Sequence, residues 1–436
     1  NITIPNTPEG MVNQIEVSPH DPATVYVAFN SYKYNDFTPH VFKSTDYGQS
    51  WTRLVNGIAP EAHVRVVRED PNQKDLLYAG TETGLYVSFN GGQHWENFQN
   101  NLPVVPITDL MIQDNDMIVA TQGRAFWVMD DLNPLYELTD AQNADFYVYD
   151  SEPAIRDLAF RTERPELGQN PYEGFAMKYY IKENSDITDL TVEIHDSNGL
   201  VVRTFTTDSK AKKGKIKKKT GMNLLHWNMA MEEFDPVEGV FAGIGTGPAI
   251  VAPGEYKAVF KYGDKEVSKN LNVNPDPRWS ASQADYLAQQ AALKPIGEAL
   301  RETRKSAENL RSLRDQIEDL QSRVSAEDYP EWNDQADELI ESINEVEGRL
   351  IQTKQKTFQD VINFPNQMDV ELAHIYGVIS NQEPPVTDGQ KAYASDMLAK
   401  YSGLMKEATE VMKSVDALQQ ALIDQKIPFI GPKKKD

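Results

Sequence analysis

The stretch Phe42-Lys43-Ser44-Thr45-Asp46-Tyr47-Gly48-Gln49-Ser50-Trp51 decides how the first third of this chain is interpreted. A second copy, Tyr86-Val87-Ser88-Phe89-Asn90-Gly91-Gly92-Gln93-His94-Trp95, repeats its order of aromatic, Ser, Asp or Asn, Gly and Trp. The pattern predicts a strand that ends in a tight turn and returns as another strand. The Asp or Asn side chain accepts hydrogen bonds from the turn's own backbone, the Gly allows positive φ, and the Trp packs over the hairpin. The residues that we expect to build the two turns are Ser44, Asp46, Gly48, Trp51, Ser88, Asn90, Gly92 and Trp95.

The spacing of the copies indicates a repeat protein. Asn90 follows Asp46 by 44 residues, a period that is typical of propeller blades and solenoids. A third, degenerate copy occupies residues 126–135, where Asp131 follows Asn90 by 41 residues but the Gly and the Trp are missing. Three blade-like units are therefore expected.

These motifs resemble the Asp-box, or BNR, repeat of sialidases, sortilin-type receptors and many secreted bacterial proteins labelled glycosyl hydrolase. Phrases at residues 18–28, 66–71 and 79–85, and Ala120-Thr121-Gln122-Gly123-Arg124-Ala125-Phe126-Trp127, are similar to the sortilin-like bacterial subgroup. Residues 372–378 also match the helical C-terminal region of that subgroup, so the resemblance covers nearly the entire chain. It implies an exported bacterial protein, either secreted, periplasmic or on the cell surface. It also implies that the Asp-box residues are structural turns rather than catalytic groups.

Composition restricts the classes of partner. The 436 residues are enough for two or three domains, and the formal net charge of −23 argues against nucleic acid or an anionic membrane as the main partner. No apolar run approaches the roughly 20 residues of a membrane span, so a soluble, acidic protein is expected. The absence of cysteine excludes disulfides, thiolate metal sites and a cysteine nucleophile.

Residues 1–140 are predicted to form an incomplete β-propeller of about three blades. The expected strands are 13–18, 24–30, 40–44 and 50–54; 63–68, 75–80, 85–88 and 94–98; and 107–112, 117–121, 125–129 and 135–138. A closed propeller needs about four to eight blades. Because the chain starts at Asn1 directly in blade-like sequence, we expect the remaining blades in a removed N-terminal portion or another polypeptide. Residues near 1–60 are therefore predicted to pair with protein outside this chain.

After residue 140 the sequence pattern changes twice, first to that of another β domain and then to that of long helices. Residues 141–277 are predicted to form an Ig-like β-sandwich, with strands at 175–181, 190–195, 201–206, 221–228, 255–261 and 267–273. Residues 278–425 are predicted to form an antiparallel helical bundle, with helices at 282–324, 331–357, 368–379 and 388–423, and residues 426–436 a frayed tail. The fold class is thus multidomain, β plus α.

No catalytic residue, metal site or cofactor is predicted. The seven histidines are scattered without a metal-ligand spacing, and no Gly-x-Ser-x-Gly turn is present. Glycoside hydrolysis needs two carboxylates across a cleft, or a tyrosine beside an arginine cluster in sialidases, and abundant acidic residues alone do not indicate such a site. If a ligand binds at strand ends facing a propeller channel, the candidates are Arg68, Glu69, Glu82 and Arg124. For Arg68 and Glu69, ordinary ion pairs on the surface or between blades are the preferred interpretation.

Three functions remain open. The first is a non-enzymatic binding or scaffold protein, the C-terminal part of a sortilin-like propeller protein, whose partners are its own remaining blades and another protein or peptide. The second is a carbohydrate-active enzyme acting on a glycan, with catalytic residues in the missing blades. The third is a subunit of a cell-envelope assembly in which the helical bundle is the docking surface.

Overall fold

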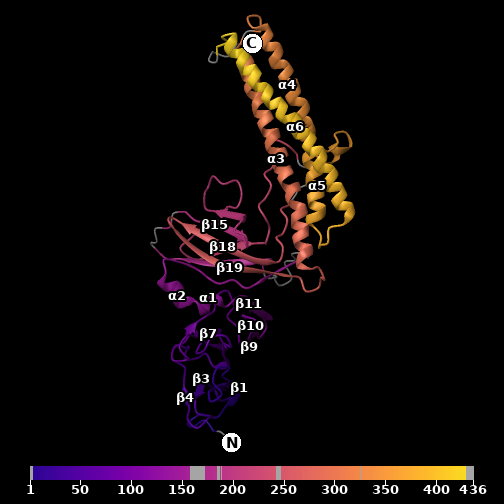
Figure 1. The fold of residues 1–436 in the computed structure, drawn as a ribbon. Coiled ribbons are helices and arrows are strands. Elements are labelled where there is room, and N and C mark those ends of the chain that lie inside the picture. The colour runs from indigo at the N-terminus through magenta and orange to yellow at the C-terminus, as the bar shows by residue number, and fades with distance from the viewer. Residues whose placement is uncertain are drawn as a thin grey trace. The chain divides into compact units, whose positions relative to one another are not determined.

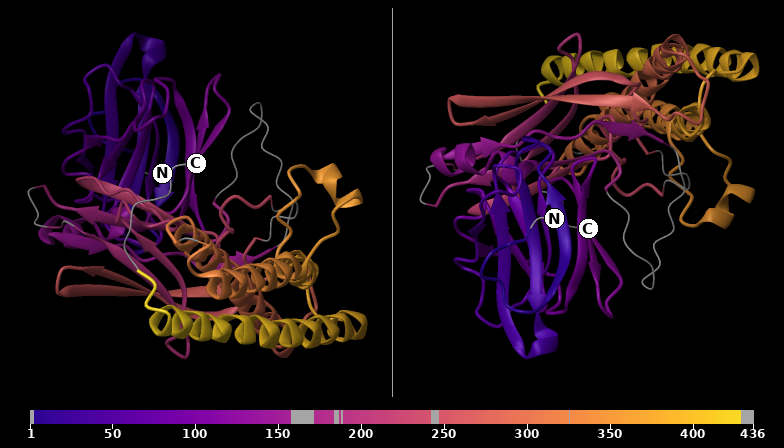
Figure 2. Two further views of the ribbon diagram at one scale, coloured as in Figure 1. Left: turned by 90° about the horizontal axis from the view of Figure 1, so that it is seen from above. Right: turned by 90° about the horizontal axis from the view of Figure 1, so that it is seen from below.

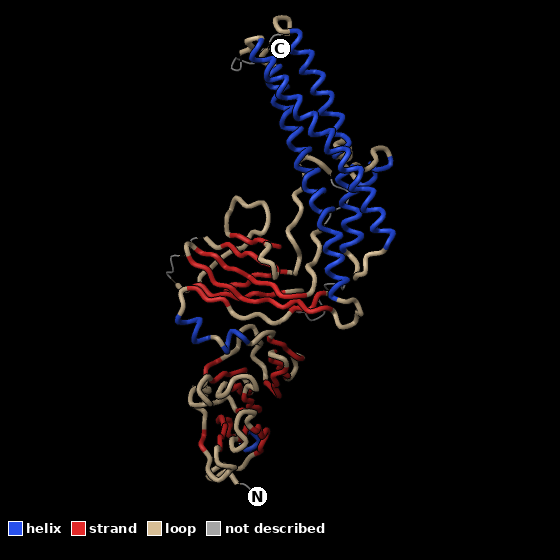
Figure 3. Tube along the Cα trace, in the orientation of Figure 1, coloured by secondary structure: helices blue, strands red, loops and turns tan. Residues whose placement is uncertain are grey.

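The fold is known from a computed structural model that describes residues 3–157, 172–183, 187, 189–241, 247–324 and 326–428. The chain forms two compact units, one made of Asn1–Asp150 with Lys178–Glu183 and the other of Ser151–Met177 with Asn184–Asp436. Figure 1 labels their elements, and Figure 3 shows strands as the main regular elements of the first unit and long helices in the second. The predicted tail lies mostly outside the described residues.

Three antiparallel sheets follow one another in the first unit, and each is a simple meander. The first has the order β1-β2-β3-β4, with the 3-10 helix η1 (Tyr32–Tyr34) between β2 and β3, and the second has the order β5-β6-β7-β8. The third has only three strands, in the order β11-β10-β9. The strands are β1 (Met11–Val17), β2 (Val25–Ser31), β3 (Asp36–Ser44), β4 (Thr52–Arg53), β5 (Val64–Glu69), β6 (Leu77–Thr81), β7 (Leu85–Ser88), β8 (Glu96–Asn97), β9 (Ile107–Gln113), β10 (Asp116–Thr121) and β11 (Phe126–Met129).

The sheets pack face to face through two apolar cores. One core joins the first sheet to the second and includes Tyr26, Ala28 and Val41 on one side and Val64 and Val67 on the other. The next core joins the second sheet to the third through buried side chains of the same kind. Successive antiparallel meanders that pack through buried faces are the arrangement of propeller blades, so we refer to the three sheets as blades, the third with three strands.

The prediction of a fourth strand at residues 135–138 is wrong. Helices α1 (Asn133–Tyr136) and α2 (Leu138–Asn143) occupy this segment instead. Pro134 stands in the first turn of α1, where its fixed φ and missing N–H suit a helix start. The third copy of the motif has lost the Gly and Trp of the other two, so no closed turn leads into a returning strand.

The second unit contains a five-stranded sheet with the order β13-β19-β18-β15-β16. The sheet is antiparallel except that β13 runs parallel to β19, and the sequence did not predict β13. Beside it, β17 neighbours β14, whose first half belongs to this unit. The second half of β14 belongs to the first unit, where β12 pairs with it. The strands are β12 (Phe146–Val148), β13 (Ala154–Arg156), β14 (Phe175–Ile181), β15 (Thr191–Asp196), β16 (Val201–Thr206), β17 (Gly221–Trp227), β18 (Gly254–Tyr262) and β19 (Lys265–Pro275).

Four α-helices and the 3-10 helix η2 (Phe358–Ile362) complete the described part of the second unit. Helix α3 (Gln283–Gln321) begins at a capping box in which Ser282 and Asp285 bond each other's backbone N–H groups. Apolar side chains of α3, α4 and α6 share one core, and those of α3, α5 and α6 share another. Figure 2 shows α6, drawn in yellow, from two further directions. The other helices are α4 (Pro330–Leu350), α5 (Met368–Ser380) and α6 (Asp388–Asp424).

The prediction that the second helix extends to residue 357 is wrong, since α4 ends at Leu350. Ile351 is extended, and the amide side chains of Gln352 and Gln355 donate to the carbonyl oxygens of Pro365 and Phe364. These bonds hold a loop in the segment where the helix was expected to continue. No helix in the described part of the chain has the length and apolar character of a membrane span.

Candidate functional site

The first motif turn is closed by its own side chains. The Asp46 carboxylate accepts hydrogen bonds from the backbone N–H groups of Gln49 and Ser50, both at 2.9 Å, and from the Ser50 hydroxyl at 2.6 Å. The Gly48 N–H donates to Ser44 Oγ at 2.8 Å, and Gly48 has a φ of 85°. These hydrogen bonds, the Ser50 bonds first, lower the pKa of Asp46 from 3.8 to about 2. All of these contacts stay within the turn, so they stabilise structure rather than bind a ligand.

The second turn repeats this pattern with a neutral amide. Asn90 Oδ1 accepts from the His94 N–H at 2.9 Å, and Ser88 Oγ accepts from the Gly92 N–H at 3.0 Å. The tryptophan of this copy, Trp95, is 1% exposed in the core between the first and second blades. Its indole N–H donates to the Leu54 carbonyl oxygen of the preceding blade at 3.1 Å. The motif tryptophan thus binds its own blade to its neighbour.

Arg68, the first of the predicted ligand residues, is held among all three blades. Its guanidinium lies 2.7 Å from a Glu16 carboxylate oxygen and 3.0 Å from an Asp109 carboxylate oxygen, and its Nε donates to the Leu110 carbonyl oxygen at 2.8 Å. Glu16 comes from β1, Arg68 from β5 and Asp109 from β9. The side chain therefore links the blades electrostatically.

Glu69, the second candidate, is buried beside Arg68. One of its carboxylate oxygens accepts the Asp75 N–H at 3.0 Å, within the same blade. Burial, followed by the nearby Glu69 charge, raises the pKa of the Tyr26 hydroxyl in the first blade. Glu69 consequently faces the interface between blades rather than an open channel.

Glu82, the third candidate, lies in the β6–β7 turn. Its carboxylate accepts from the Arg65 guanidinium at 2.7 Å and lies 3.3 Å from the His63 imidazole. The His63 ring stacks on Tyr32 with centroids 5.2 Å apart. Burial lowers the pKa of His63, whereas the Glu82 charge opposes this effect. The cluster joins the β2–β3 connection of the first blade to the second blade.

The four candidates do not form one site. Glu69 pairs with Leu77 at the end of β5, whereas Thr81, just before Glu82, pairs with Val64 at the start of that strand. These ends are separated by the length of β5. Arg124 lies in the β10–β11 turn and is exposed, with a guanidinium hydrogen bond to its own neighbour, the Gly123 carbonyl oxygen.

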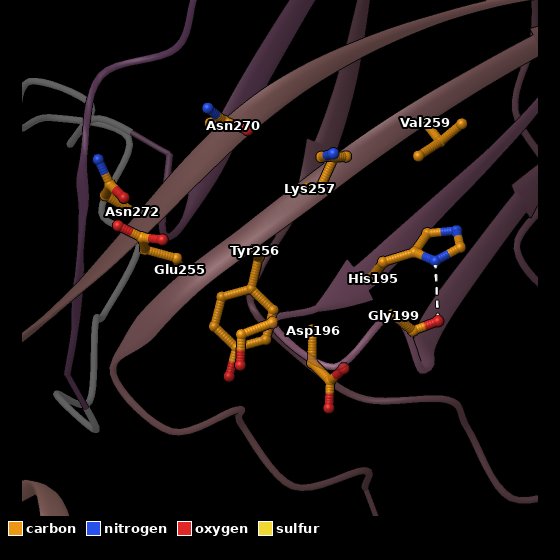
Figure 4. A pocket seen from close by; sticks show the side chains of 10 residues that line it. His195, Asp196, Gly199, Glu255, Tyr256, Lys257, Val259, Asn270 and Asn272 are labelled. Carbon is orange, nitrogen blue, oxygen red and sulfur yellow. Dashed lines mark hydrogen bonds between the residues drawn. The ribbon is translucent and has the colours of Figure 1, made fainter.

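A polar pocket lies on the five-stranded sheet of the second unit (Figure 4). Cross-strand pairing aligns His195 with Lys257 and Lys257 with Asn270. The His195 ring is already engaged, with Nδ1 3.1 Å from the Gly199 carbonyl oxygen and Nε2 2.9 Å from Glu193. Hydrogen bonds from Lys261 and then His195 lower the pKa of Glu193. The titratable groups His195, Glu193 and Lys261 are thus paired with one another.

Carboxyl groups with raised pKa values occur in both units, at Asp130 in the first and at Asp369 in the second, where burial raises the pKa to about 6. Among the described residues, no three His, Asp or Glu side chains gather as a metal site requires. In the first unit, burial and then the nearby Asp116 charge raise the pKa of the Asp130 carboxyl. Asp130 follows β11, and its neighbour Asp131 pairs with Lys178 at 2.9 Å.

Sequence reasoning missed most of the partners that fix these candidates. Glu16 and Asp109 were not singled out, although both occupy the first strand of a blade, as Arg68 does. Their shared location on the first strand of each blade was the one signal that could have identified them as partners of Arg68. The stacking of Tyr32 on His63 had no signal, because the helix η1 that carries Tyr32 was not predicted.

Comparison with known proteins leaves the family open. No protein-family model matches the chain, and no curated protein matches it. Among solved structures, an ancestral GH74 enzyme is similar with 14% identity and a TM-score of 0.25, over 47% of this chain and 28% of that one. The GH74 xyloglucanase of Xanthomonas campestris is similar with 13% identity and a TM-score of 0.23, over 60% of this chain and 47% of that one. YCF48 bound to D1 peptide is similar with 10% identity and a TM-score of 0.22, over 62% of this chain and 70% of that one.

This chain spans less than half the length of the two enzymes. All three TM-scores are low, so the description of the sheets as blades rests on the repeats and interfaces of this chain itself.

Proposed function

We propose that this chain is a non-enzymatic binding or scaffold protein whose blades recognise a protein or peptide partner. On the resemblance of its motifs, we also propose that it is an exported bacterial protein of the Asp-box, sortilin-like kind, with an Ig-like sandwich and a helical bundle after its blades. The observation that carries the binding function is the position of exposed apolar side chains on the two outermost blades.

The first blade exposes Val12, Ile15 and Val17, all on β1. We call these three residues the leading face. They pair with the second strand so that Val12 lies opposite Phe29 and Ile15 opposite Val27, which places them on one side of the sheet.

The third blade exposes Met111, Phe126 and Val128, which we call the trailing face. Ile118 of β10 pairs with both Met111 and Val128, so these side chains also share one side of their sheet. In the middle blade, no strand residue is among the exposed large apolar side chains. Apolar groups gathered at both ends of the arc favour a macromolecular partner, because contiguous exposed apolar surface typically marks an interaction site.

The charged residues support the same function. Two of the four predicted ligand residues are engaged in ion pairs. Arg68 pairs with carboxylates of the first and third blades, and Glu82 pairs with Arg65 of its own blade. A group held in this way stabilises the arc and is not free to act on a substrate.

A displayed library of random peptides tests the proposal. Peptides enriched on the wild-type chain should lose at least about tenfold in affinity for Phe126→Lys, because a charge would then have to be buried in the interface. The control is Leu287→Lys, which alters another exposed apolar residue, in the second unit. Retained affinity in Phe126→Lys, or binding of β-glucan oligosaccharides with no peptide bound, would contradict the proposed function.

A further inference from the structure

The three blades have matching positions, which strand register identifies. In each blade the first strand bulges at the same place, where pairing shifts between Val12 and Gln14, between Val64 and Val66, and between the partners of Ile107 and Asp109. Counted from the bulge, the residues at the first, fourth and sixth places correspond to one another. They are Val12, Ile15 and Val17; Val64, Val67 and Glu69; and Ile107, Leu110 and Ile112.

These matched positions have opposite environments. Val64, Val67 and Ile107 are each 0% exposed, because the preceding blade covers them. At the leading face Val12 is 53% exposed, and Ile15 and Val17 are each 62% exposed. The first position of the repeat is therefore buried in the second and third blades and exposed to solvent in the first.

The motif tryptophans show the same difference. Trp95 is buried between blades and donates its indole N–H to the Leu54 carbonyl oxygen of the preceding blade. Trp51, its match, packs partly buried against the outer side of the first blade, near Phe29 and Phe42. Its indole N–H donates to the Gly48 carbonyl oxygen in its own turn, at 3.2 Å. Trp51 thus occupies the repeat position of an interface tryptophan, but its indole bonds to its own turn instead of to a preceding blade.

The interfaces inside the chain show what such a face accepts. The second blade is covered by Tyr26, Ala28 and Val41 of the first. The third is covered at the matched place by Tyr78, Gly80 and Leu85 of the second. The approach is close, since a Cβ on Gly80 would lie 2.6 Å from Ile107 Cγ2. The covering surface therefore combines a tyrosine and a very small residue on one strand with an aliphatic residue on the next strand.

We infer that the leading face is the docking surface for one further four-stranded blade of this same repeat. This inference rests on the proposed function, which assigns binding to the leading and trailing faces, and it names the partner of the leading face. The docking blade presents a tyrosine, a glycine or alanine and an aliphatic side chain to Val12, Ile15 and Val17. A carbonyl oxygen after its last strand accepts the Trp51 indole N–H, as Leu54 accepts that of Trp95. A second copy of this chain is disfavoured as the occupant, because each copy carries a formal charge of −23.

The test uses the absence of cysteine from the chain, which allows a single thiol to be introduced and labelled. A second copy of residues 62–106, the middle blade with its outgoing connection, is fused through its C-terminal end to Gly10 of the chain carrying Val17→Cys. The added blade should lower the maleimide labelling rate of that thiol at least about tenfold. The matched control is Val67→Cys, which should be protected with or without the added blade because Val67 is already covered.

Two results would overturn the inference. One is an unchanged labelling rate at Val17→Cys in the extended chain, which includes the case where the added blade does not order itself on this face. The other is protection of Val17→Cys in the unextended chain with a dimer in sedimentation, which would make a second copy the occupant. Neither measurement uses the peptide-binding trailing face, so failure here and failure of the proposed function are distinguishable.

Discussion

At the scale of single residues, the motif turns of this chain are built from short-range hydrogen bonds that the sequence pattern predicts. The serine, the Asp or Asn and the glycine of each copy have the partners that their spacing indicates. What the spacing could not predict is the destination of the tryptophan, because Trp95 bonds to a residue 41 positions earlier in another blade. Local pattern fixes a turn, whereas burial of a ring depends on which blade lies beside it.

The charge of Asp46 makes the first turn sensitive to acid. Its pKa in the folded protein is about 2, below its ordinary 3.8, so its hydrogen bonds add stability above pH 3.8 that is lost as the pH falls through 2. We predict that Asp46→Asn lowers the Tm at pH 7 and that the difference from wild type narrows between about pH 4 and pH 2. Calorimetry across this range checks the prediction, with Asn90→Ala as the uncharged control. A difference that is constant with pH would show that the Asp46 charge contributes nothing.

Arg68 is predicted to stabilise the arc rather than to bind a ligand. Arg68→Met removes charge-assisted hydrogen bonds to Glu16 and Asp109 and should cost about 1.5–3 kcal/mol in the free energy of unfolding. Arg124→Met, at an exposed side chain, should change it by less than about 0.5 kcal/mol. Denaturant unfolding measures both. Equal effects of the two substitutions would contradict the structural role of Arg68.

At the scale of elements, a buried arginine joins strand to helix in the second unit. Arg156 of β13 is 1% exposed and bonds both Glu383 carboxylate oxygens at 2.8 Å. Its Nη2 lies 3.3 Å from Gln289 Oε1 of α3, and its guanidinium lies 4.8 Å from the Tyr286 ring centroid. Sequence reasoning could not find this contact, since Arg156 and Glu383 are far apart in the chain and β13 is only three residues long.

Breaking this pair should be costly. Arg156→Met leaves the buried Glu383 carboxylate uncompensated, so we predict a loss of about 3–5 kcal/mol in the free energy of unfolding. The matched control is Arg349→Met, which breaks an exposed pair with Glu407 and should cost less than about 1 kcal/mol. Denaturant unfolding followed by far-UV dichroism, which reports the helices, is the measurement. A loss as small as the control's would mean that the pair does not stabilise the unit.

The limits of sequence prediction also belong to the element scale. Strands and helices with a clear period were predicted closely, as β14, β16 and α6 show. The errors occur at the ends of patterned segments, where local signals decide the structure. Pro134 starts a helix where a fourth strand was expected, and side-chain bonds from Gln352 and Gln355 hold a loop after α4 where helix was expected.

At the scale of the whole molecule, the repeat explains both the interior and the surface of the blades. Each interior interface covers the same positions with the same kinds of side chain, and the positions left over at the two ends of the arc are apolar and exposed. The candidate site was predictable only in part, because the sequence directed attention to four charged residues at strand ends. In the structure Arg68 is engaged between blades, Glu69 and Glu82 have partners within their own blade, and Arg124 is exposed.

Thiol labelling of the unmodified arc tests this account most directly. Val17→Cys and Val67→Cys occupy first strands of neighbouring blades, one on an open face and one on a covered face, so their maleimide labelling rates compare the two environments. We predict that Val17→Cys reacts at least about a hundredfold faster than Val67→Cys, which is shielded by the first blade. Similar rates at the two positions in the monomeric chain would contradict the claim that the leading face is open.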